Sequence, residues 1–261
     1  MTTFADFIKR NTVKPAGMLP LVHTTRALHL KRIKESNEIV KSWCDVFQED
    51  LNYFFVGRPA YKHRPGQEQA AYWELPACFI MEFDAVADVR RVYPFDTGAH
   101  ADGRMPGFIQ IIDRKEYEVV GVPDAPQRII GAFFKSASDY FRLEVKERKQ
   151  FDTEFSLSVW DAEIKALHML AASAEISAMD DRRLCVELQS GASVPLINNK
   201  LLAIVCPSIY LDDPDFRNHI ERVWNAEPIS YNMQPLSYQH YIGQIYERVQ
   251  SFYVQRKILP P

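Results

Sequence analysis

The chain has only four cysteines, and none of them stands in a metal-binding pattern. Cys44, Cys78, Cys185 and Cys206 are scattered, without a C-x-x-C pair or a neighbouring histidine ligand. This distribution argues against a zinc site and against a disulfide scaffold. It predicts reduced, mostly buried thiols. The histidines also lack a ligand spacing such as H-E-x-x-H, so we expect no metal.

An excess of one charge and a long apolar run are also missing. The 31 basic and 34 acidic residues leave a net charge of −3, which creates no global field to gather nucleic acid, although a local basic patch remains compatible with it. No apolar run approaches the roughly 20 residues that a bilayer requires, and the N-terminal sequence lacks a basic stretch followed by an apolar one. We therefore expect a cytoplasmic protein with no membrane partner.

The common nucleotide-binding and hydrolase signatures are absent as well. No G-x-G-x-x-G follows an expected strand, and no G-x-S-x-G occurs. Gly98 and Gly103 copy the spacing of a phosphate-binding loop, but Arg104 and Met105 replace the required Lys and Ser or Thr. The segment is therefore expected to be a plain flexible loop.

What the chain does contain is typical of a globular protein. It is 261 residues long and has 47% apolar, 12% aromatic and 25% charged residues, with no internal repeat and with its sixteen prolines spread throughout. We expect one domain over residues 1–261, with helical decorations at both ends.

The pattern of apolar residues predicts strands and helices mixed without regular βαβ alternation, which favours an α+β fold. The expected strands cover residues 21–25, 52–56, 77–83, 108–112, 183–189 and 201–206. The first expected helix begins near residue 27, is capped by Thr24 or Thr25, and has Leu28 and Ile33 on its inner side. Further helices are expected at residues 137–148, 161–177, 213–224 and 238–254. Residues 93–104 are expected to form a loop over one face.

The most informative stretch is an aromatic strand that ends in a cation and a phenol. Tyr53 begins three bulky residues that suit a pleated strand, Gly57 permits a bend, and Pro59 cannot donate to a following ladder. Arg58 and Tyr61 are therefore expected at a strand end, where ligand contacts are common. A purely structural turn explains the pattern equally well.

Two further residues are candidates for chemistry. Alternation places Glu187 on the less apolar face of the strand at 183–189, where a fixed carboxylate can stabilise a positive centre; the alternative is a polar face that meets water. His23 ends an apolar pair and, with Thr24, can hydrogen-bond a ligand hydroxyl; the alternative is a structural histidine.

Taken in order, these pieces resemble the His–Tyr–Glu arrangement of ADP-ribosyltransferases, most closely the DarT-like and related toxin branches. The matching segments are H-T-T-R-A-L at 23–28, Y-F-F-V-G-R-P at 53–59 and R-L-C-V-E at 183–187, so the resemblance spans roughly residues 20 to 210. It implies a split β-sandwich with flanking helices that holds NAD as co-substrate without a Rossmann fold, and no metal.

The resemblance also implies roles for the matching residues. His23 and Thr24 would bind the nicotinamide-side ribose, Tyr53 or Tyr61 would stack on the nicotinamide, Arg58 would contact the pyrophosphate, and Glu187 would hold the ribose hydroxyl and stabilise the oxocarbenium-like centre. His23, Arg58 and Glu187 would then line one cleft.

One departure affects the expected acceptor. Many family members have Gln or Glu two residues before the catalytic Glu, whereas this chain has Cys185 there and Gln189 two residues after. The departure favours nucleic acid over protein as acceptor, in a toxin or phage-defence effector with a possible antitoxin partner. Two alternatives stay open: an RNA phosphotransferase of the same fold and a non-catalytic binding module.

Overall fold

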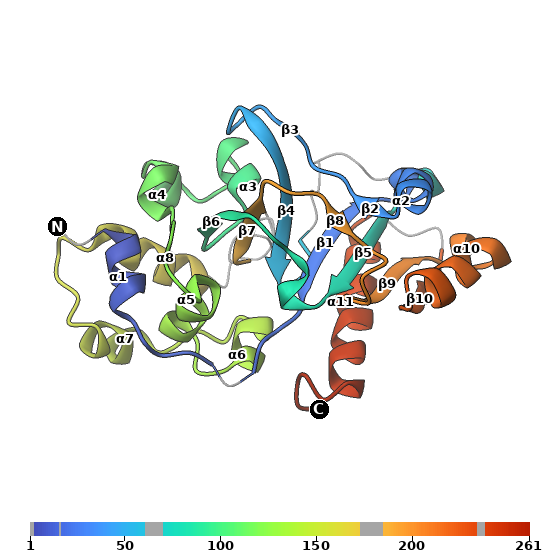
Figure 1. Ribbon diagram of the computed structural model, residues 1–261. Helices are drawn as coiled ribbons and strands as arrows, with labels where there is room; N and C mark the ends of the chain where they lie inside the picture. Colours follow the sequence, from blue (N-terminus) through green and yellow to red (C-terminus); the bar gives the residue numbers. More distant parts are fainter. Residues whose placement is uncertain (1–2, 16, 61–69, 173–184, 234–237) are drawn as a thin grey trace. The chain divides into compact units, whose positions relative to one another are not determined.

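The computed structural model describes residues 3–15, 17–60, 70–172, 185–233 and 238–261, which are drawn in colour in Figure 1. The chain divides into two compact units, each built from two separate segments. Met1–Met18 and Arg90–Gln189 form what we call the helical unit, and Leu19–Val89 and Ser190–Pro261 form the sheet unit. Strands and helices together make an α+β architecture, as the sequence predicts, and the strands form a mixed sheet.

The sheet unit is built on a mixed sheet in the order β10-β9-β5-β1-β4, with β3 paired to β4. Neighbours are antiparallel except β9 and β10, which run parallel. The strands of this unit are β1 (Leu21–Arg26), β2 (Glu38–Ile39), β3 (Ser42–Cys44), β4 (Glu49–Val56), β5 (Pro76–Met81), β8 (Val194–Pro195), β9 (Leu201–Pro207) and β10 (Glu227–Tyr231). β2 and β8 form a separate antiparallel pair.

Helices border this sheet. They are α2 (Leu30–Ser36), α9 (Ser208–Leu211), α10 (Pro214–Asn218) and α11 (Tyr238–Gln255), with 3-10 turns at Ala27–His29, Tyr72–Glu74 and Phe83–Ala85 and a π-helical turn at His219–Val223. The long helix α11 packs against β5, β9 and β10 (Figure 1). One side of this helix belongs to the core, because Tyr241, Ile245, Val249 and Phe252 are all buried.

The helical unit contains α1 (Phe4–Arg10), α3 (Thr97–Ala101), α4 (Gly107–Gln110), α5 (Ala125–Phe133), α6 (Ala137–Arg142), α7 (Arg148–Glu154), α8 (Ala162–Ala172) and a 3-10 turn at Arg114–Tyr117. The helical unit also contains most of two strands, β6 (Val89–Tyr93) and β7 (Glu187–Ser190). These two strands are neighbours in the sheet. Aromatic rings hold its helices together. Phe7 lies in edge contact with Phe133, Phe151 and Phe155, at centroid separations of 6.4, 6.5 and 4.9 Å.

The strand expected at residues 108–112 is wrong, because residues 108–110 belong to helix α4 and residues 111 and 112 follow it in a turn. Its apolar run is too short for periodicity to separate strand from helix, and Pro106 precedes the helix as its N-cap. The loop expected at residues 93–104 is wrong in part. It contains α3, and Tyr93, Phe95 and Asp96 are buried rather than lying over a face.

Two expected helices also differ from the structure. The first begins with the 3-10 turn at Ala27–His29, and no side chain caps this turn. Ile33 is buried as expected, but Leu28 is 58% exposed rather than on the inner side. The helix expected at 137–148 ends at Arg142, because Leu143 adopts a left-handed conformation with φ 59°. A left-handed residue cannot continue a right-handed helix.

The four cysteines are free thiols, three buried and Cys44 half-buried. Among the helices that the structure describes, none is long and apolar enough to cross a bilayer.

Candidate functional site

The end of β4 is shaped by Gly57. This residue has φ +66°, its N–H donates to the carbonyl of Pro20 at 2.7 Å, and its carbonyl accepts from the hydroxyl of Tyr253 at 3.0 Å. A Cβ atom at this position would come within 2.5 Å of the Leu19 side chain. The predicted bend is confirmed, and both the left-handed backbone and the close approach require glycine.

We expect Gly57→Ala to destabilise the fold more than Gly121→Ala. Both glycines have positive φ, so each substitution brings the left-handed penalty of roughly 1–2 kcal/mol. Only at Gly57 must a neighbour, Leu19, also move, which adds about 1.5 kcal/mol of overpacking, because nothing lies within 4 Å of a Cβ at Gly121. Urea unfolding of the two variants measures the difference. Equal free energies of unfolding would contradict the close packing at Gly57.

Arg58 follows the bend and is buried, with 3% of its surface exposed. One terminal nitrogen, Nη2, lies 3.5 Å from the hydroxyl of Tyr246, and the guanidinium carbon lies 5.8 Å from the centre of the Tyr246 ring. Helix α11 therefore supports the cation through a residue that the sequence did not single out. Tyr61, the predicted phenol beside Arg58, lies outside the described residues.

His23 lies on β1 opposite Phe79 of β5. Its Nδ1 is 2.9 Å from the carbonyl oxygen of Tyr53, and because a carbonyl only accepts, Nδ1 carries the hydrogen. Burial lowers the pKa of His23, so the ring is neutral at pH 7 and Nε2 is left as an acceptor. This geometry suits the predicted contact with a ligand hydroxyl.

Thr24 and Tyr53 have partners of their own in the sheet unit. The Thr24 hydroxyl donates to the carbonyl of Ala60, so it offers a ligand its lone pairs only. The Tyr53 hydroxyl donates to Sγ of Cys44 at 2.7 Å, which ties this ring to β3. Sequence spacing gave no sign of either contact, because both join segments that only the folded sheet brings together.

Glu187 lies in the helical unit at the start of β7 and is 1% exposed. Its Oε2 accepts from the backbone N–H of Thr97 at 3.0 Å, and its Oε1 accepts from the Thr97 hydroxyl at 2.7 Å. Gln189 donates to the same Oε1 at 2.8 Å. Three hydrogen bonds therefore fix the carboxyl group on a rigid strand.

The alternative interpretation, in which Glu187 lies on a polar face that meets water, is wrong. All four residues of β7 are buried, so both faces of this strand are covered. The strand also begins at Glu187 rather than earlier; of the expected range, residues 183 and 184 lie outside the described residues. Cys185, two residues before Glu187, is fully buried.

Burial changes the acidity of Glu187. Burial first, and then the nearby charge of Asp96, raise the pKa of Glu187 to about 8, against the opposing effect of the hydrogen bonds from Gln189 and Thr97. Asp96 is itself held as the N-cap of α3, where it accepts from the N–H of Ala99 at 2.8 Å. The result is a carboxyl group that is mostly protonated at neutral pH and poised to ionise just above it.

Around this carboxyl group the structure adds residues that sequence reasoning missed. Arg91 donates to the amide oxygen of Gln189 at 3.0 Å and thereby orients the amide nitrogen toward Glu187. Thr97 and Asp96 lie in the segment that the sequence predicts to be a loop, whereas in the structure they begin helix α3. The only sequence signal was Asp96 at the start of a possible helix, because an N-cap accepts backbone N–H groups.

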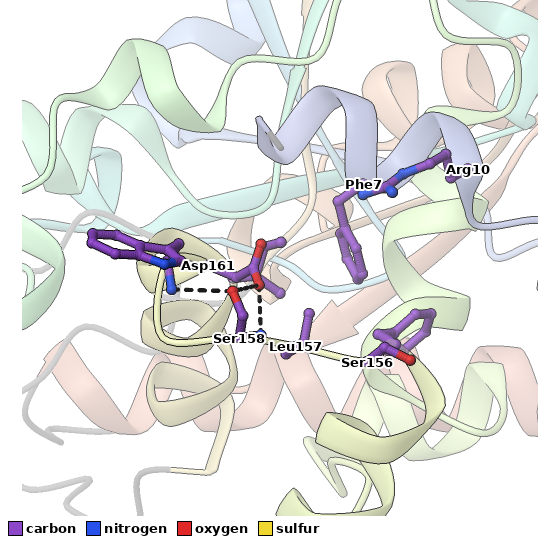
Figure 2. A pocket seen from close by; sticks show the side chains of 9 residues that line it. Phe7, Arg10, Ser156, Leu157, Ser158 and Asp161 are labelled. Carbon is purple, nitrogen blue, oxygen red and sulfur yellow. Dashed lines mark hydrogen bonds between the residues drawn. The ribbon is translucent and has the colours of Figure 1, made fainter. Parts of the chain in front are cut away.

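A separate hollow of about 630 Å³ lies in the helical unit (Figure 2). It is lined by apolar side chains such as Phe7 and Leu157 and by Arg10, Ser158 and Asp161. Ser158 donates to Asp161 from its N–H at 2.7 Å and from its hydroxyl at 2.8 Å, and these bonds lower the pKa of Asp161. Its carboxylate is thus ionised and engaged, so we place no chemistry here despite the size of the hollow.

Lys146 of the helical unit has a structural role. Lys146 is buried and pairs with Glu154 at 2.9 Å while donating to the carbonyl of Gly131 at 3.0 Å. Within the described residues no group of acidic, histidine or cysteine side chains is arranged to hold a metal ion.

No model of a known protein family matches the chain, and a search of curated proteins finds no relative. The functional argument therefore depends on the residues and their geometry.

Proposed function

We propose that the chain is an NAD-dependent ADP-ribosyltransferase that modifies a macromolecule, with nucleic acid favoured over protein. The observation that carries the proposal is the Glu187 carboxyl group, which is buried and fixed by Thr97 and Gln189 on a strand. A rigid carboxylate without solvent around it is suited to stabilise positive charge that exists only in a transition state.

Each residue has a definite task in this reaction. Glu187, once ionised, would stabilise the positive charge that develops at the ribose carbon C1′ as its bond to the nicotinamide nitrogen breaks and the electron pair of that bond leaves with nicotinamide. A hydroxyl or amine of the acceptor then bonds to C1′ and releases a proton. His23, neutral and with Nε2 as acceptor, holds a ribose hydroxyl, and Arg58 meets the pyrophosphate.

The resemblance of the three sequence segments supports the split β-sandwich assignment and these roles. Gln189 adds a feature of this chain. The family's usual Gln or Glu before the catalytic residue is replaced by buried Cys185, and here the residue two positions after Glu187 makes the supporting hydrogen bond. This difference favours a nucleic-acid acceptor, in a cytoplasmic toxin or phage-defence effector that an antitoxin protein could hold in check.

The direct test is incubation of the purified protein with NAD, first alone and then with DNA, RNA or a protein extract. Released nicotinamide together with a mass increase of one ADP-ribose on one acceptor class supports the proposal. A folded protein that releases no nicotinamide with any acceptor would leave the binding-module alternative.

The rate is expected to rise with pH. Glu187 must be ionised to stabilise the positive centre, and its pKa is raised to about 8, so kcat/KM for nicotinamide release should increase about tenfold per pH unit below that value and level off above it. Initial rates between pH 5.5 and 9.5 check this. A profile flat from pH 6 to 9 would contradict the role of Glu187.

A further inference from the structure

A basic segment directly follows the strand that carries His23. Arg26, Lys31, Arg32 and Lys34 occur with no acidic residue between positions 26 and 34, in a chain whose net charge is −3. The first three are exposed and Lys34 is half-buried. Within the described part of the chain, none of the four side chains forms an ion pair, and the next acidic residue is the exposed Glu35.

The fold turns these charges outward. β1 runs without a break into the 3-10 turn at Ala27–His29 and then into α2, and the buried Ala27, Leu30 and Ile33 anchor the inner side. Because residues three and four apart share a helix face, the intervening Lys31 and Arg32 lie on the outer side. The basic segment is thus a surface on a fixed scaffold rather than a free tail.

Two exposed aromatic side chains lie beside the basic segment. The N–H of Ala27 donates to the carbonyl of Leu75 at 2.8 Å, which joins the turn at Ala27–His29 to the turn at Tyr72–Glu74. Tyr72 and Trp73 on that second turn are 43% and 46% exposed, with ring centroids 4.9 Å apart. Exposed rings next to unneutralised cations are the pattern that binds single-stranded nucleic acid, since phosphates meet the cations and bases stack on the rings.

The basic segment also reaches the candidate ribose contact. Arg26, the first residue of the basic segment, is the last residue of β1 (Leu21–Arg26), the strand that carries His23. A nucleic acid held along Arg26 to Arg32 would therefore lie at one end of the β-strand that carries His23.

We propose that the basic segment, together with Tyr72 and Trp73, binds a single-stranded nucleic acid, with phosphates on the lysine and arginine side chains and one or two bases stacked on the rings. The inference rests on the proposed function in naming this strand as the acceptor. The binding itself needs no NAD and is tested without it.

The experiment measures fluorescence anisotropy of labelled dT12, rU12 and a 12-base-pair duplex at several salt concentrations. Lys31→Ala/Arg32→Ala should weaken binding of the single strands at least tenfold, and the loss of two phosphate contacts should flatten the slope of log K against log salt by about 1.4. Trp73→Ala should weaken binding by roughly tenfold with little change of slope, because stacking releases no counterions. The duplex should bind more weakly than either single strand.

Matched variants in the helical unit serve as controls. Lys135→Ala/Lys149→Ala removes two exposed positive charges, and Trp160→Ala removes an indole that is 72% exposed. Both should bind the single strands like wild type, and thermal melting confirms that every variant is folded. Comparison of dT12 with rU12 identifies which nucleic acid is preferred.

Equal affinity of wild type, Lys31→Ala/Arg32→Ala and Trp73→Ala would overturn the inference, as would a wild-type protein that binds neither single strand. Tighter binding of the duplex would also overturn it, since paired bases cannot stack on the rings. Nicotinamide release by the wild-type protein, measured separately, shows whether the proposed function fails on its own.

Discussion

Glu187→Gln is expected to lower the rate of nicotinamide release by at least ~100-fold, the scale seen when one preorganised electrostatic contact is lost. Glutamine keeps the length and shape of the side chain but never ionises. In wild type the carboxylate acts on charge that appears as the glycosidic bond breaks, so its loss raises the barrier and leaves ground-state contacts in place. Affinity for NAD, measured by calorimetry, should therefore stay nearly unchanged.

The contacts around Glu187 indicate that the variant folds. A glutamine oxygen can accept from the N–H of Thr97, and its amide can donate to the Thr97 hydroxyl oxygen. Gln189 loses its bond to Oε1 but can still donate to the Thr97 hydroxyl, which lies 3.2 Å from its amide nitrogen. Burial raises the Glu187 pKa, so the stability that this group contributes is present below its unfolded value near 4.5 and is lost as pH rises toward about 8. The introduced glutamine cannot ionise, so the Glu187→Gln variant does not lose folding stability in this way as pH rises. Its melting temperature should therefore depend less on pH across that range.

Glu163→Gln is the matched control. Glu163 is another carboxyl group of the helical unit whose pKa is raised by partial burial, but it lies outside the hydrogen bonds of Glu187. It should release nicotinamide at the wild-type rate. If expression of the wild-type chain is toxic, Glu187→Gln should relieve toxicity and Glu163→Gln should not. A folded Glu187→Gln protein with wild-type turnover would contradict the mechanism.

Arg58→Ala is expected to weaken NAD binding by roughly 2 kcal/mol, the size of a lost charged hydrogen bond, which corresponds to about 30-fold in Kd. The guanidinium is buried after the Gly57 bend and supported by Tyr246, so it is held in place before the ligand arrives. Arg58→Lys should fall between wild type and alanine, because an ammonium group keeps the charge but cannot bind a pyrophosphate with two parallel hydrogen bonds. Calorimetry gives the three affinities.

Arg256→Ala provides the comparison. Arg256 belongs to the same unit and also lies over an aromatic ring, 5.3 Å from the centre of Phe252, while pairing with Glu227 at 3.0 Å. Its removal should leave NAD affinity unchanged. Unchanged affinity in both Arg58→Lys and Arg58→Ala would remove Arg58 from the site, and the lysine variant keeps this test informative if alanine unfolds the chain.

The sequence predicts the strands of the sheet unit well because their signals are local and agree with one another. Aromatic and β-branched runs bounded by turn residues indicate β1, β4, β5 and β9, and the glycine before Arg58 indicates the bend. Prediction fails where a short apolar run fits two periodicities. Helix α4 is the example, since packing against α8, and not the run itself, decides its conformation.

The sequence by itself determined the α+β class, the end of β4 at Gly57 and Arg58, and the candidate residues His23 and Glu187. Only the tertiary structure decided their chemical states. Tyr53 fixes the hydrogen on Nδ1 of His23, and burial beside Asp96 turns Glu187 from an ordinary carboxylate into one with a raised pKa. Spacing along a chain cannot supply this information, because the free energy of a charge depends on the solvent removed around it and on partners that are distant in sequence.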